Sequence, residues 1–126
     1  MLFRLLKKRR AIRSFVYQLP LELWRRFGEK TYYSFEQIDR IFKDGEYNRA
    51  FSAYAYAILC SRSDFDGYFD GLNVKCTYDG LREIVADKYL DGHTDFDAPT
   101  LVRFARNSGV QSFDENCEST SGSYPP

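Results

Sequence analysis

The chain has 126 residues, of which 44% are hydrophobic and 29% are charged. These values exclude a disordered chain, a collagen-like fibre and a membrane-embedded protein, and the length suits one ordinary domain. Three cysteines without a CxxC pair favour reduced thiols in a cytosolic protein over a zinc ribbon or a disulfide framework. The longest apolar stretch, 50–60, is too short to span a bilayer, so we expect a cytoplasmic protein.

The first predicted helix runs from about residue 3 to residue 18. Its apolar positions recur at helical spacing and form one inward stripe, namely Leu5, Ile12, Val16 and Leu19. Pro20 is expected to end or kink this helix, because proline lacks the backbone donor that a helix interior needs. A short second helix over 21–27 should then end at Gly28.

Ser34 and Gln37 have the spacing of a capping box, which predicts the start of a third helix that stops near Gly45. Asn48 is expected to cap a helix over 49–61 that is apolar almost all round. A helix without a polar face belongs in the middle of a bundle. We therefore expect 49–61 to be the most buried helix.

The second half of the chain predicts three further helical segments. A short helical turn covers 63–69, and Thr77 caps an amphipathic helix that reaches Leu90. The apolar positions predicted to face inward on that helix are Leu81, Ile84, Val85 and Leu90. Asp97 caps a last helix that Gly109 terminates, and residues 110–126 have the composition of a disordered tail.

These elements predict an all-α fold, a compact bundle of five or six short helices. Residues 1–109 form a single helical domain with a basic N-terminal helix, and the disordered C-terminal tail follows as 110–126.

Charge is divided unevenly although the formal net charge is zero. Residues 1–30 hold nine basic and two acidic residues, whereas 64–97 hold nine carboxylates and three basic residues. The basic candidates for binding an anionic partner are Arg4, Lys7, Lys8, Arg9, Arg10 and Arg13. One interpretation is that this helix packs across the acidic half of its own fold; the other is that it reaches an anionic partner.

The apolar residues Leu2, Phe3 and Leu6 stand beside this cationic cluster. That pattern resembles helices that lie on an anionic membrane surface, and it could also contact nucleic-acid phosphates. Sequence-specific DNA reading is not expected, because the second helix of the hairpin over 34–60 offers Arg49 and is otherwise apolar.

Chemical signatures are sparse. Asp91, His93 and Asp95 alternate in one loop and could ligate a divalent metal, although Asp91 also suits a helix end and a loop histidine is usually solvated. Cys60 falls within the core helix, where a thiol is inert, and no P-loop, GxGxxG, HExxH or GxSxG motif occurs. We expect no cofactor and no enzymatic activity.

Four segments resemble a family of small uncharacterised bacterial proteins, known as a domain of unknown function. They are the Leu-Phe…Lys-Lys-Arg-Arg-Ala-Ile start, Tyr33-Ser-Phe-Glu-Gln, Tyr54-Ala-Tyr-Ala-Ile-Leu-Cys60 and Cys76-Thr-Tyr-Asp-Gly-Leu-Arg. The resemblance covers roughly residues 2–95. It implies a bacterial, cytosolic origin and carries no activity with it.

The function expected from these observations is a non-enzymatic protein-interaction or regulatory module, with another protein or a second copy as partner. The first alternative is peripheral membrane binding, at the inner membrane face, or nucleic-acid binding through the basic helix. The second is a small-molecule or metal-binding protein or an enzyme that uses the acidic 64–97 region. A pocket lined by Tyr54 or Tyr56 with converging Asp or Glu side chains would favour that second alternative.

Overall fold

The computed structural model describes residues 2–69 and 77–108, with side chains given for 5–69 and 77–107. Within these ranges every regular element is a helix and there is no strand, which confirms the all-α prediction. The elements in chain order are α1 (Leu2–Tyr17), α2 (Leu19–Phe27), α3 (Phe35–Asp44), the 3-10 helix η1 (Arg49–Phe51), α4 (Ser52–Leu59), α5 (Arg62–Phe69), α6 (Tyr78–Tyr89) and α7 (Ala98–Ser108). The predicted tail, 110–126, and the predicted stop at Gly109 lie outside the described residues.

The predicted helix starts are confirmed by side-chain caps. The Ser34 hydroxyl accepts from the Gln37 amide at 3.2 Å, and the Gln37 side chain accepts from the Ser34 amide at 3.1 Å. The other three predicted caps also accept from an amide of the first turn that follows them; they are Asn48, Thr77 and Asp97. Each cap supplies an acceptor to an N–H group that has no partner within its own helix.

The predicted ends of the first two helices are also confirmed. α1 ends at Tyr17, and Pro20 stands in the first turn of α2, where a missing N–H costs nothing. Gly28 ends α2 with a φ of 85°, a backbone conformation that glycine adopts freely. The predicted helix over 49–61 is divided, because its first turn is the 3-10 helix η1 and α4 begins only at Ser52.

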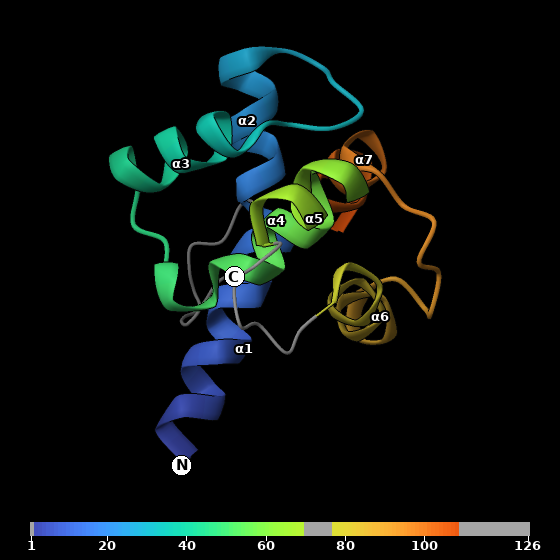
Figure 1. Cartoon of the computed structure of the whole chain (residues 1–126). Coiled ribbons are helices and arrows are strands. Elements are labelled where there is room, and N and C mark those ends of the chain that lie inside the picture. Colours follow the sequence, from blue (N-terminus) through green and yellow to red (C-terminus); the bar gives the residue numbers. More distant parts are fainter. Residues whose placement is uncertain (1, 70–76, 109–126) are drawn as a thin grey trace.

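α4 lies at the centre of the fold. It contacts α1, α3, α5 and α6, and Figure 1 shows the other helices arranged around it. Every residue from 54 to 60 is buried, so the expectation of a central apolar helix is confirmed. α1 packs on α2, α7 and α4, and the buried side chains form one hydrophobic cluster that takes members from all the α-helices.

Two residues predicted to face inward are exposed. Leu5 is 52% exposed, because the amino-terminal end of α1 extends beyond the other helices. Ile84 is 46% exposed, because the buried arc of α6 is centred on Tyr78, Arg82 and Val85 and leaves Ile84 to one side. The inward positions predicted for Leu5 and Ile84 are therefore wrong.

Candidate functional site

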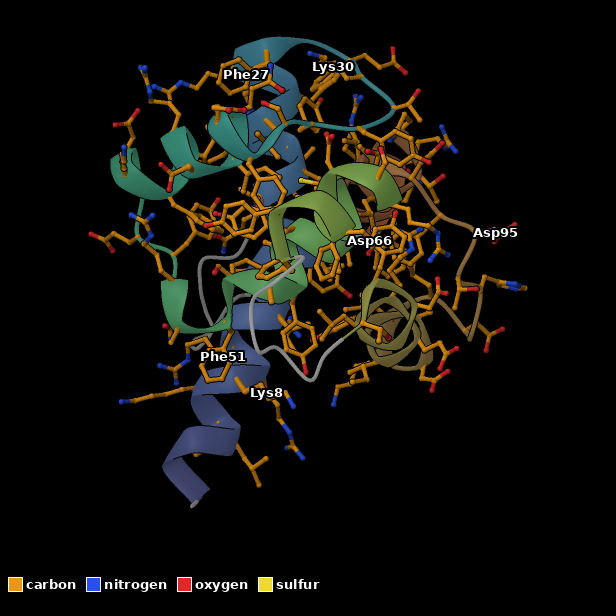
Figure 2. All side chains as sticks on the ribbon, viewed as in Figure 1. Lys8, Phe27, Lys30, Phe51, Asp66 and Asp95 are labelled. Carbon is orange, nitrogen blue, oxygen red and sulfur yellow. The ribbon has the colours of Figure 1, made fainter. Side chains whose placement is uncertain are left out.

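The outward surface of α1 carries the basic residues singled out in the sequence. Lys7, Arg9, Arg10 and Arg13 are exposed, and Lys8 is half-buried with its Nζ 5.4 Å from the centre of the Tyr54 ring. Figure 2 shows Lys8 on the part of α1 that lies near η1 and Phe51. The guanidinium of Arg13 stands 5.2 Å from the Tyr17 ring. The side chain of Arg4 is not among those described.

Within 5–69 and 77–107, no carboxylate forms an ion pair with these cations. The ion pairs within the described residues join Arg26 to Asp44, Lys43 and Arg49 to Asp39, and Arg62 to Asp79. None of these ion pairs involves a lysine or arginine of α1. Where α6 approaches α1 it contributes Ile84, Lys88 and Tyr89, and no carboxylate, to the groove between the two helices. The positive charge of α1 is therefore not neutralised by ion pairs in the part of the fold described.

A broad depression of about 750 Å³ runs along this surface. Its charged lining consists of one carboxylate, that of Glu46, and five cations, which are Lys7, Arg9, Arg10, Arg13 and Lys88. We call the four of these cations that lie on α1, which are Lys7, Arg9, Arg10 and Arg13, the basic face of α1. Arg9 and Lys88 also line a smaller hollow of about 160 Å³ between α1 and α6.

Apolar side chains stand beside the basic face. Leu5 and Ile84 line the hollow between α1 and α6, where each leaves about half of its surface exposed. Leu6, also on α1, is 45% exposed. Large exposed apolar groups next to a cationic cluster are typical of a docking surface rather than of a solvated helix face.

Arg82 was not identified in the sequence analysis, yet it is the buried charged residue of the described core, with 6% of its surface exposed. Its guanidinium donates to the carbonyl oxygens of Ala57 at 3.1 Å, Thr94 at 3.0 Å and Phe96. It also lies over the Phe96 ring at 3.8 Å and over the Tyr78 ring at 5.1 Å. Burial lowers the pKa of Arg82 from its ordinary value.

The position of Arg82 on its helix carries a signal that could have identified it. Tyr78, Arg82, Val85 and Ala86 follow one another at spacings of four, three and one, and so share one face of α6. A cation within an apolar face is expected to find acceptors in the interior. Arg82 connects α6 to the end of α4 and to the segment before α7, and it is part of the structure rather than of the basic face.

The proposed metal ligands do not form a cluster. Asp91, His93 and Asp95 are all exposed, and Figure 2 shows Asp95 pointing away from the helices. Asp91 and Gly92 close the end of α6, as expected, with the Gly92 amide donating to the Ala86 carbonyl at 2.9 Å. In the ranges 2–69 and 77–108 no group of three or more His, Cys, Asp or Glu residues is arranged to hold a metal ion.

Cys60 is fully buried at the end of α4, which agrees with an inert thiol. Burial, followed by the negative charges of Asp64 and Glu36, raises the pKa of the thiol to about 12. The thiol is therefore protonated and inaccessible at neutral pH.

No helix of the described residues is long and apolar enough to cross a membrane.

The fold and surface define a small all-helical protein with a cationic and partly apolar face. A family of unknown function (DUF6559) matches residues 2–124, and the chain belongs to that family. This confirms the resemblance to a domain of unknown function and extends it beyond the predicted range of 2–95. Comparisons with curated proteins and with solved structures found no match.

Proposed function

We propose that the chain is a non-enzymatic interaction module that docks on an anionic lipid surface through the basic face of α1. The observation that carries the proposal is the hollow between α1 and α6. There the exposed apolar residues Leu5 and Ile84 stand among the cations Lys8, Arg9 and Lys88, and no carboxylate lines the hollow.

Both kinds of residue contribute to binding at a lipid interface. Each cation near an anionic leaflet contributes about 1 kcal/mol. The apolar side chains gain by leaving water for the boundary between headgroups and acyl chains. In a cytoplasmic protein this surface would be the inner membrane face.

The apolar residues favour lipid over nucleic acid. Phosphates of DNA or RNA attract the same cations, but exposed Leu5 and Ile84 would gain nothing from contact with a sugar–phosphate backbone. Pairing of two copies through this face would bring like charges together, which disfavours self-association there.

The test is co-sedimentation of the protein with vesicles of phosphatidylglycerol and phosphatidylcholine, with pure phosphatidylcholine vesicles for comparison. The triple variant Lys7→Gln, Arg9→Gln, Arg10→Gln should lose binding to the anionic vesicles. Its melting temperature should not change, because these three side chains form no ion pair with described residues. Lys8 and Arg13 are left in place because each packs on an aromatic ring.

A matched control removes three exposed cations from other elements, in the variant Arg25→Gln, Lys30→Gln, Arg103→Gln. It should bind anionic vesicles nearly as well as the natural chain. The variant Leu5→Ser, Ile84→Ser should bind vesicles more weakly but leave the salt dependence in place.

If the natural chain binds duplex DNA and the variant Leu5→Ser, Ile84→Ser binds it equally well, the partner is a nucleic acid instead. If the natural chain binds neither vesicles nor DNA at low ionic strength, the proposal is wrong, and a protein partner becomes the better account of the module.

A further inference from the structure

A second surface hollow, distant from α1 in sequence, lies between α3, η1, α4 and α5. It has a volume of about 680 Å³. Its aromatic lining includes Phe35, Tyr56 and Tyr68, and its carboxylates are Glu36, Asp39 and Asp64. We call it the Tyr56 cleft. Its size is that of a small-molecule site.

The rings of the Tyr56 cleft pack against one another and are partly open to solvent. The Phe35 ring lies 4.1 Å from the Tyr68 ring, with an angle of 22° between their planes, and 4.2 Å from the Tyr56 ring. Tyr68 is nevertheless 55% exposed. Ring faces that remain accessible within a hollow are the groups that bind ammonium and guanidinium ions.

The charges around the cleft favour a cation. Arg49 also lines it, but Arg49 is ion-paired to Asp39. Glu36 and Asp64 form no ion pair within the described residues. Each stands in the first turn of a helix, where a carboxylate is stabilised by the helix dipole, so their charge alone does not mark a site.

The hydroxyl of Tyr56 supplies the independent observation. Tyr56 is 7% exposed and lines the cleft, yet its hydroxyl makes no hydrogen bond to any residue in the described ranges. Burial, followed by the charges of Asp39 and Tyr68, raises the pKa of Tyr56 to about 12, so the hydroxyl is protonated at neutral pH. A buried hydroxyl without a partner is costly, and its oxygen is free to accept from a donor in the cleft.

We propose that the Tyr56 cleft binds an organic cation, an ammonium or guanidinium group on an apolar body. The charged group lies against the Tyr68 and Phe35 rings and donates to the Tyr56 hydroxyl, while Asp64 and Glu36 supply the opposite charge. The apolar body contacts the remaining ring surface. The cation comes either from a free amine or from a lysine or arginine side chain of another protein.

The test is a titration of the isotope-labelled chain, followed by amide chemical shifts. The probes are phenethylammonium, the neutral alcohol 3-phenylpropan-1-ol and the anion 3-phenylpropanoate. Phenethylammonium should give saturable shifts in α3, η1, α4 and α5, and the other two should give weaker ones. Equal binding of the alcohol or the anion, or no saturable shift with phenethylammonium, would overturn the proposal.

Variants locate the site. Tyr68→Ala should weaken phenethylammonium binding by roughly twofold to thirtyfold, the range of one cation–π contact. Tyr32→Ala removes a similarly exposed ring elsewhere and should leave binding unchanged. Asp64→Asn should weaken binding and Asp66→Asn, on the same helix but outside the cleft lining, should not. If either control lowers affinity as much as its partner, the cation does not bind in this cleft.

A capped lysine, Nα-acetyl-lysine methylamide, separates the two sources. Tighter binding of the capped lysine than of phenethylammonium assigns the cleft to a side chain of a protein, and the reverse assigns it to a free amine. Tyr56→Phe should lower affinity for either probe, because it removes only the hydroxyl acceptor.

Discussion

Arg82 shows how one residue joins three parts of the chain. Its guanidinium donates to the Ala57 carbonyl near the end of α4, where a helix lacks partners for its last carbonyls. It also donates to the carbonyls of Thr94 and Phe96 in the segment between α6 and α7. No ion pair of the described residues involves it, so carbonyl dipoles and two ring faces stabilise its charge. The planar guanidinium can do this because it presents several donors at fixed angles.

We predict that Arg82→Ala lowers the free energy of unfolding by roughly 3 to 5 kcal/mol, because it leaves buried carbonyls without donors. Arg82→Lys should recover little of the loss. An ammonium group lacks the planar shape and the several fixed donors with which the guanidinium stacks on Phe96 and reaches three carbonyls at once. Urea denaturation monitored by circular dichroism measures both values. Arg103→Ala, at an exposed position of α7, serves as the control; an Arg82→Ala loss no larger than the control's would contradict the structural role.

Cys60 gives the fold a dependence on alkaline pH. The unfolded thiol loses its proton near its ordinary pKa of 9.0, whereas the buried thiol keeps it until about 12. The unfolded state therefore binds fewer protons between these values, so this contribution to stability is complete below pH 9 and is lost as the pH rises. The raised pKa of Tyr56, from 10.0 to about 12, acts in the same direction.

The predicted outcome is a free energy of unfolding that falls between about pH 9 and pH 12, with a shallower fall in Cys60→Ala. Urea denaturation at a series of pH values measures the two slopes. The smaller side chain of the variant lowers stability at every pH, so the slopes are compared and not the absolute values. Equal slopes would show that the thiol does not titrate differently in the two states.

At the scale of single helices, two glycines should respond in opposite ways to the same substitution. Gly28 closes α2 with φ 85° and ψ 177°, a conformation nearly confined to glycine. Gly67 lies inside α5, and a Cβ there would meet nothing within 4 Å. Glycine inside a helix is destabilising because it loses more backbone freedom on folding than alanine does.

Gly28→Ala is therefore expected to lower the free energy of unfolding by about 1 to 3 kcal/mol. Gly67→Ala should raise it by about 0.5 to 1 kcal/mol. Chemical denaturation of the two variants beside the natural chain decides the matter, and a change of the same sign in both would contradict the backbone argument.

At the scale of the whole molecule, the sequence predicted those features of the fold that depend on residues close together along the chain. Caps such as Ser34 and Thr77 act within one turn of their own helix, so their spacing was sufficient to place the helix starts. The exposure of Leu5 and Ile84 depends on which helices pack beside them. Periodicity shows which residues share a face but not whether another helix covers it.

The candidate surfaces follow the same division. The basic residues of α1 were evident from composition, but the apolar hollow beside them is formed with α6, which lies more than sixty residues further on. The Tyr56 cleft combines residues of four elements, so no local sequence pattern predicts it. Arg82 carried a local signal, since it interrupts the apolar face of its helix.

The end of α4 has a consequence for the motions of the native state. The Leu59 carbonyl accepts from the Tyr33 amide at 2.8 Å, and the Cys60 carbonyl accepts from the Tyr78 hydroxyl at 3.2 Å. Together with Arg82, these bonds join residues that are far apart along the chain. The Tyr33 amide cannot open unless the surrounding core also opens.

Hydrogen–deuterium exchange should therefore find the Tyr33 amide, although it lies in a loop, among the slowest in the protein, with an opening free energy close to that of global unfolding. Amides of the first turns of α1, which extend beyond the other helices, should exchange through local fraying. Rapid exchange at Tyr33 would show that the loop opens independently of α4. Slow exchange at Tyr33 would place a loop amide, held by the carbonyl of Leu59 in α4, in the most protected core of this protein.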